Sequence, residues 1–383
     1  MSKRKKLTRP LLNMMSNENF NERIIIVLRD KNIVKKIKPT KPNQTERKKY
    51  VKNVRSINKN SHRNLKRFIR NNNGRDIKSM DFLNIISFRG NKSLVEKLSR
   101  RRDVAKIDIE NYMILPEEEL YTSNKTIKNN FQKLWNHEMI NHNNENSTTV
   151  QNSTIVQDIT VSILDTGIDV NHKEFTDIVD LSRSKSFIRS EKSVVDYNGH
   201  GTHVAGIIGG RTVGICKDIK IMSVKCYNKK GIGSTNSLIQ GIEYSIINEA
   251  DVIQLFLNKD SDLDYKNGLD VALRKSLDVG IHVCVSIEKS LNDMYKQIKT
   301  AGIIDKKGNK FGNKRRFYAP GIGVWSSDIN NKYKYLNGIS MSTAHLTGLI
   351  ASILQIKQNV FPWNIRIKRN KNFVIDKNRS CCT

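Results

Sequence analysis

The stretch IKIMSVKCYNKKGIGSTNSLIQGIEYSIINEADVIQLFL, residues 219–257, decides the fold. It begins with an apolar run typical of a buried strand, continues with a segment of helical spacing, and ends with a second apolar run. Two neighbouring strands joined through a helix are parallel, because a parallel pair needs a crossover connection. The stretch therefore predicts an α/β domain built on a parallel sheet.

The alternation of strand and helix continues on both sides of this stretch. Apolar strands are predicted at residues 158–164 and 281–287, and helices at residues 201–210, 269–280 and 349–356. Strands that are apolar along their whole length are typical of a sheet with helices on both faces. In such a sheet, a functional site is expected at the carboxyl ends of the strands.

The N-terminal part of the chain has a different pattern. The order strand, helix, strand, helix, strand predicts a small α+β domain before the α/β domain, with those elements at residues 23–30, 50–70, 81–88, 92–103 and 104–115. Five segments result. They are a basic arm at 1–22, the α+β domain at 23–115, an Asn-rich linker at 116–154, the α/β domain at 155–357, and a basic tail at 358–383.

The charge of the chain is concentrated near its N-terminus. The 383 residues carry a formal net charge of +30, and residues 1–71 hold 22 Lys and Arg residues against four acidic ones. Such an excess points to nucleic acid or an anionic surface. Neither a zinc-ligand spacing nor an RNA-binding aromatic signature accompanies it. We interpret the charge as a solvated basic face and expect nucleic acid not to be a partner.

Cysteine usage and hydropathy bear on the compartment. Five scattered cysteines without a CxxC pair argue against a disulfide framework, although a single bridge stays open. The basic N-terminus lacks an apolar core of signal-peptide length, and no run of about 18 apolar residues suggests a membrane span. On these features alone we expect a cytosolic protein.

Three short motifs carry candidate chemistry. Asp165 in LDTGID ends a predicted strand, His200 in GHGTHVAG opens a helix, and Ser340 in GISMSTAHLTG precedes a helical turn. Free backbone N–H groups at that turn favour negative charge. Each residue has an ordinary alternative: a turn aspartate, a surface histidine or a metal pair with His203, and an N-cap serine. No carboxylate follows the two histidines on the same helix face.

The three motifs in this order resemble the signature blocks of the subtilisin-like serine proteases, the subtilase family, in which Asp, His and Ser follow one another along the chain. The resemblance extends over residues 134–357. It is nearest to the proteinase K branch, through GRTVGICKDIKIMSVKCYNKKGIGSTNSLIQGIEY and RRFYAPGIGVWSS. The N-terminal module resembles the inhibitory propeptide of the same family, through RIIIVLRD and VEKLSRRRDVAKIDIENYMIL.

This resemblance implies a serine endopeptidase acting on polypeptides. Ser340 is then the nucleophile, His200 the general base and Asp165 the residue that orients the imidazole. It also implies a self-processed, monomeric zymogen whose propeptide is an intramolecular partner, with cleavage within residues 115–133. No cofactor is expected, although the family resemblance allows calcium without indicating a site. The resemblance implies secretion, in conflict with the cytosolic expectation.

Several positions depart from the family pattern. Lys289 stands where the family has the oxyanion-hole asparagine, and its ammonium is an alternative donor. In the substrate-binding segment Phe256, Leu257 and Asn258 replace a Ser-Leu-Gly pattern, and Ala344 replaces a proline of the serine block. Two further hypotheses follow: a weakened or inactive pseudoprotease that binds peptide or protein partners, and a basic nucleic-acid-binding protein.

Overall fold

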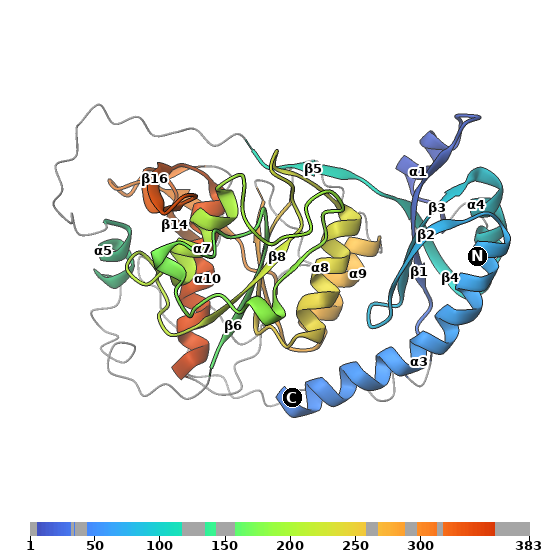
Figure 1. The fold of residues 1–383 in the computed structure, drawn as a ribbon, viewed down its shortest axis with the longest axis horizontal. Coiled ribbons are helices and arrows are strands. Elements are labelled where there is room, and N and C mark those ends of the chain that lie inside the picture. The colour runs from blue at the N-terminus through green and yellow to red at the C-terminus, as the bar shows by residue number, and fades with distance from the viewer. Residues whose placement is uncertain are drawn as a thin grey trace. The chain divides into compact units, whose positions relative to one another are not determined.

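A computed structural model describes residues 6–31, 34, 44–116, 135–142, 158–257, 267–287, 297–311 and 317–356 (Figure 1). The chain divides into two compact units. The first comprises Met1–Met113, Gly233–Glu249 and Ser261–Gly280, and the second comprises Ile114–Ile232, Ala250–Asp260 and Ile281–Thr383. The five segments expected from the sequence remain a prediction.

The first unit contains a four-stranded antiparallel sheet in the order β2-β3-β1-β4. The central strand β1 pairs with β3 on one side and β4 on the other, with Ile26 opposite Ile86 and Ile107. Its core is built from β-branched and leucine side chains of the sheet and of the packed helices. The strands are β1 (Asn21–Leu28), β2 (Arg75–Met80), β3 (Ile85–Asn91) and β4 (Val104–Ile109).

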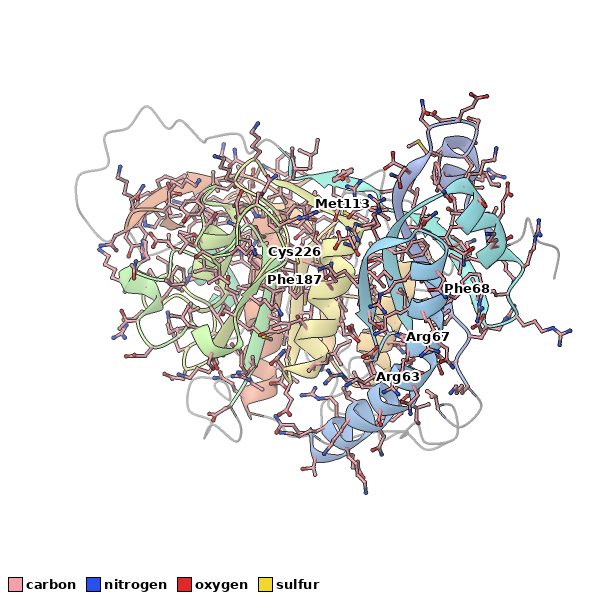
Figure 2. The ribbon with its side chains drawn as sticks, turned by 45° about the vertical axis from the view of Figure 1, so that its right-hand side comes forward. Arg63, Arg67, Phe68, Met113, Phe187 and Cys226 are labelled. Carbon is pink, nitrogen blue, oxygen red and sulfur yellow. The ribbon has the colours of Figure 1, made fainter. Side chains whose placement is uncertain are left out.

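Within the described residues, five helices belong to the first unit. The longest, α3, has a buried stripe that recurs every three or four residues and includes Val51, Val54, Leu65 and Ile69, which explains why it forms a helix. Arg63, Arg67 and Phe68 are labelled on α3 in Figure 2. The helices are α1 (Arg9–Met14), α3 (Gln44–Asn71), α4 (Lys92–Ser99), α8 (Thr235–Ile247) and α9 (Gly268–Asp278).

Two predicted strands of this unit need correction, and one strand was missed. The strand predicted at residues 81–88 begins only at Ile85, because residues 81–84 form a turn in which Asn84 has a φ of 61°. Strand β2 was not predicted, since its side chains are mostly polar and only Met80 is buried. The strand predicted at 104–115 is divided into β4 and β5 (Tyr112–Ile114). The other strand and the two helices predicted there are confirmed, although α3 is longer than expected.

The second unit contains the predicted parallel sheet, in the order β11-β10-β6-β8-β7. All four pairings in this sheet are parallel. Its apolar side chains form one core with α7 and α10, which also pack against each other (Figure 1). The strands are β6 (Thr160–Asp165), β7 (Lys185–Ser186), β8 (Lys220–Lys225), β10 (Val252–Phe256) and β11 (His282–Ser286), and the helices are α7 (His200–Gly209) and α10 (Ile339–Ile356).

Smaller elements complete the described chain. A three-stranded sheet has the order β13-β12-β14, and an antiparallel hairpin pairs β15 with β16 directly before α10. None of the helices within the described ranges has the length and apolar character needed to cross a membrane. The remaining elements are α5 (Trp135–His142), η2 (Lys173–Phe175), η3 (Leu181–Arg183), β9 (Ile232–Ser234), β12 (Ala301–Ile304), β13 (Lys310–Phe311), β14 (Phe317–Pro320), β15 (Val324–Asp328) and β16 (Lys332–Leu336).

Candidate active site

Asp165 is the last residue of β6 and is almost completely buried. Its carboxylate oxygen Oδ1 accepts hydrogen bonds from the backbone N–H of Thr166 and from Nδ1 of His200, both at 2.7 Å. Its backbone carbonyl accepts from the N–H groups of Cys226 and Tyr227. Asp165 therefore does more than stabilise its own turn, because its carboxylate contacts a side chain from another helix.

His200 is the first residue of α7, and its side chain is 3% exposed. Because a carboxylate oxygen only accepts hydrogen bonds, Nδ1 carries the proton and Nε2 is the basic nitrogen of the neutral ring. Glycine is required next to it, since a Cβ on Gly201 would lie 2.2 Å from the carbonyl oxygen of Gly167. The buried position contradicts the alternative of a surface histidine.

The start of α7 is held by Asp196, a residue that sequence reasoning missed. Its carboxylate accepts hydrogen bonds from the N–H groups of Asn198 (2.9 Å), Gly199 (3.0 Å) and Thr202 (2.9 Å), and from the Thr202 hydroxyl (2.7 Å). These bonds satisfy N–H groups that a helix start leaves without partners and fix the backbone on both sides of His200. An acidic residue four positions before the histidine was the available signal.

His203 has a different partner from that of His200. It is fully buried, and its Nε2 lies 3.2 Å from the carbonyl oxygen of Lys334. Burial lowers the pKa of His203 to about 3, so the ring stays neutral. In the described ranges, no group of three or more His, Cys, Asp or Glu side chains is arranged to hold a metal ion. Calcium binding remains an expectation from the resemblance.

Ser340 is the second residue of α10 and is 2% exposed. Its Oγ makes no hydrogen bond within the part of the chain that the structure describes. The N-cap alternative is therefore wrong, because a capping hydroxyl accepts from a backbone N–H two or three residues later. A buried hydroxyl without a partner is uncommon and calls for an explanation.

The backbone leading to Ser340 is tied down at several points. The N–H of Gly338 donates to the carbonyl of Gly321 (2.8 Å), and Oδ1 of Asn337 accepts from the N–H of Gly323 (2.7 Å). On the other side of Ser340, the Ser342 hydroxyl donates to the carbonyl of Ala319 (2.9 Å). These bonds hold the first turn of α10, the helix that packs against α7.

The predicted substrate-binding residues are only partly described. Phe256 ends β10 and is 4% exposed, and its carbonyl accepts a hydrogen bond from the hydroxyl of Tyr227 (2.8 Å). Leu257 is fully buried, and its N–H donates to the carbonyl of Ser286. Asn258 and Lys289 lie outside the described residues, so their predicted roles stay predictions.

The surroundings of Asp165 contain two neutral titratable groups. Burial and, secondly, the negative charge of Asp165 raise the pKa of the Cys226 thiol and of the Tyr227 phenol well above their ordinary values. Both groups therefore stay protonated at neutral pH. His200 is the titratable side chain whose hydrogen bond to the Asp165 carboxylate directly couples the two residues.

Comparison with known proteins identifies the class. A model described as the subtilase family, peptidase S8, matches residues 156–287. The chain is 30% identical over 216 residues to subtilisin DY of Bacillus licheniformis. The aligned region covers 51% of this chain and 76% of that protein. It is 29% identical over 237 residues to an intracellular serine protease of Paenibacillus polymyxa, covering 55% and 71% of the two chains. This protein therefore belongs to the subtilase family of subtilisin-like serine proteases.

A further relative and a solved structure also match the chain. A thermostable alkaline protease of Halalkalibacterium halodurans is 30% identical over 209 residues, which is 56% of that protein. A solved structure of a cold adapted subtilisin-like serine proteinase is 27% identical and covers 54% of this chain and 78% of that one, with a TM-score of 0.48. In each of these matches about half of the present chain is aligned.

Proposed function

We propose that the protein is a serine endopeptidase in which Asp165, His200 and Ser340 form the catalytic triad. The observation that carries the proposal is the 2.7 Å hydrogen bond between buried Asp165 and His200. A second helix, packed on that of His200, has Ser340 as its second residue, and the buried Ser340 hydroxyl has no hydrogen-bond partner in the described part of the chain. Membership of the subtilase family supports the same assignment.

In the proposed reaction the Ser340 Oγ attacks the carbonyl carbon of the scissile peptide bond. His200 Nε2 takes the hydroxyl proton and then delivers it to the leaving amine, so the acyl group remains on Ser340. A water molecule, deprotonated by His200 in the same way, releases the acyl group. Asp165 keeps Nδ1 protonated and stabilises the imidazolium that forms in each step.

The rate depends on how the negative charge on the substrate oxygen is stabilised. The start of α10 supplies backbone N–H groups for that charge. Lys289 replaces the asparagine donor expected from the family. Loss of one such donor lowers turnover on the order of 10²- to 10³-fold, so we propose a slow enzyme. The alternative that this departure favours is a pseudoprotease that binds peptide or protein partners without cleaving them.

We also propose that the chain is made as a zymogen. The four-stranded sheet of the first unit would be the folding and inhibitory module, and cleavage would occur within residues 115–133. The support is the resemblance of this module to family propeptides. If the Ser340→Ala protein and the wild type keep the same intact N-terminal segment, self-processing is excluded.

The central test is labelling with a fluorophosphonate, which reacts with an activated serine. Wild-type protein should be labelled at Ser340, and Ser340→Ala should not react. Ser352→Ala is a matched control, because Ser352 is in the same helix and donates to the carbonyl of Gly348. Equal and weak labelling of wild type and Ser340→Ala would overturn the enzyme proposal. Labelling without measurable peptide cleavage would favour the pseudoprotease.

A further inference from the structure

A fully buried ammonium group lies beside the candidate triad. Lys225 ends β8, and the sheet register places it directly opposite Asp165. Its side chain has no exposed surface, and Cys226, labelled in Figure 2, follows it directly. Burial of a charged amine is costly unless each N–H has an acceptor. A lysine at this position therefore needs a specific set of partners.

The structure supplies two backbone acceptors and one ion-pair partner for this ammonium group. Nζ of Lys225 donates to the carbonyl oxygens of Thr166 (2.6 Å) and Val195 (2.9 Å), and it lies 2.9 Å from Oε2 of Glu191 in an ion pair. Two of its three donors are therefore used by backbone carbonyls, and a carboxylate balances its charge. The Glu191 carboxylate neutralises the charge of Lys225 locally. Lys225 therefore acts on the site mainly through its contacts rather than through its charge.

The acceptors belong to the two segments that present the candidate catalytic pair. Thr166 directly follows Asp165, and Val195 directly precedes Asp196, which holds the start of α7 and thus His200. One side chain therefore connects the end of β6 with the loop that leads into α7. It bonds to backbone atoms on both sides, so it restrains the positions of the two segments relative to each other.

We propose that Lys225 is a positioning residue that sets the geometry of the Asp165–His200 hydrogen bond. This inference rests on the proposed function for its effect on turnover. Without the ammonium group, the carbonyls of Thr166 and Val195 lose their shared donor and the loop before His200 shifts. Small misplacements of reacting groups are sufficient to reduce turnover strongly.

Other bonds between the same segments remain when Lys225 is removed. The N–H of Ile168 donates to the carbonyl of Val194 (3.0 Å), and the N–H of Gly201 donates to Oγ1 of Thr166 (3.0 Å). They keep the two segments together but hold different atoms. We therefore expect a folded protein with a displaced imidazole rather than an unfolded one.

The test compares Lys225→Met with Lys220→Met in the full-length protein. Lys220 is the exposed lysine at the other end of β8, and its Nζ donates to the carbonyl of Asp177. For a peptide ester substrate, Lys225→Met should lower kcat about 10- to 100-fold and change KM less than about threefold. Lys220→Met should behave like the wild type.

A spectroscopic measurement keeps the test independent of turnover. The Nδ1 proton of His200, held by Asp165, should give a low-field imidazole resonance in the wild type, and Lys225→Met should shift or broaden it. If Lys225→Met does not fold, Glu191→Ala removes the ion-pair partner of Lys225 from a partly exposed position and should give a smaller change of the same kind. An unchanged resonance and an unchanged kcat in a folded variant would overturn the inference. Absence of Ser340 labelling in the wild type would instead refute the proposed function and leave the resonance test valid.

Discussion

Both units contain a buried histidine in contact with an aspartate. In the first unit His62 Nδ1 lies 2.8 Å from Asp81 Oδ1, and in the second His200 Nδ1 lies 2.7 Å from Asp165 Oδ1. The His62 side chain has no exposed surface, and that of His200 is 3% exposed. Distance and burial therefore do not distinguish the two pairs, and the difference must come from their other neighbours.

The second ring nitrogen makes the difference. His62 Nε2 lies 3.0 Å from Oδ1 of Asn84, whose amide orientation is fixed because its NH₂ group donates to the Arg29 carbonyl and to Asp30. Both ring nitrogens of His62 are therefore held by fixed partners. A ring held in this way has no nitrogen available to take a proton from a nucleophile. It connects α3 to the turn at residues 81–84 and has a structural role.

A buried His–Asp pair alone does not define a catalytic site. The helix packed against that of His200 carries the Ser340 hydroxyl, which is buried and makes no hydrogen bond among the described residues, whereas Ser79 beside His62 is hydrogen-bonded. Ser79 Oγ lies 2.7 Å from His62 Nδ1 and donates to Asp81 Oδ1 at 2.6 Å. Four sets of variants test this distinction.

The Asp-to-Asn change should separate the two pairs most strongly. In Asp165→Asn, the amide NH₂ group favours the wrong His200 tautomer, and turnover of a peptide substrate should fall about 10⁴-fold, as in other serine protease triads. In Asp81→Asn, turnover per folded molecule should change less than about twofold. A fall of similar size in both variants would mean that the His62 pair also contributes to catalysis.

Removal of the His62 ring should affect stability. In His62→Leu, Asp81 and Asn84 lose their hydrogen-bond partner, and the free energy of unfolding should decrease by about 3 kcal/mol, because buried polar groups are left unsatisfied. Amide hydrogen exchange should accelerate in α3 and β2. Ser340 labelling of the folded fraction is the control, and a loss of labelling without a loss of stability would contradict the structural role.

The turn at residues 81–84 should also respond to pH through Glu243. The N–H of Phe82 donates to Glu243 Oε1, and burial raises the pKa of Glu243 to about 8. The folded-state pKa of Glu243 lies above the unfolded value. The stability gained by burying its neutral carboxyl group is therefore fully present below about pH 4.5 and is lost as the pH rises through 8. Glu243→Gln keeps the acceptor for Phe82 and should be less sensitive to urea than the wild type at pH 9.

The contribution of Asp81 to stability depends on pH with the opposite sign to that of Glu243. Burial opposes its ionisation, but hydrogen bonds from His62 and Ser79 outweigh that effect and lower the pKa of Asp81. Its contribution to stability is present above the unfolded pKa of about 4 and is lost as the pH falls through the folded value. A Glu243→Gln protein whose urea midpoint varies between pH 5 and pH 9 as much as that of the wild type would refute the assignment of this alkaline loss of stability to Glu243.

The smallest effect is expected from the Ser79 hydroxyl. Ser79→Ala removes one of the two hydrogen bonds to Asp81 and leaves the His62 contact in place. The free energy of unfolding should decrease by about 1 kcal/mol, with no change in Ser340 labelling. Thermal unfolding is the measurement, and a loss as large as that of His62→Leu would show that the serine, not the histidine, holds the turn.

Sequence reasoning succeeded where the pattern is local. Strands β6, β8, β10 and β11 of the second unit are mostly apolar runs, so they were predicted as parallel strands, whereas the two-residue strand β7 was not. Strand β2 was missed because it buries only Met80 and has no alternation of apolar side chains. Its pairing with β3 depends on contacts that are distant in sequence.

The same limit applies to the candidate site. Short motifs indicated Asp165, His200 and Ser340, whereas Asp196 and Lys225 have roles that depend on backbone carbonyl and N–H groups from other segments. Lys225 was visible only as a charged residue at the end of an apolar run. His62 shows the converse, because its resemblance to a catalytic pair exists only in three dimensions.

Three buried cysteines of the second unit have a practical consequence. Cys216, Cys226 and Cys284 are buried thiols. An alkylating reagent therefore reaches them only when the surrounding structure opens, so their rates of modification report on local opening. Cys226 directly follows Lys225 and donates its backbone N–H to the carbonyl of Asp165. The alkylation rate of Cys226 therefore measures how often the structure around Asp165 opens.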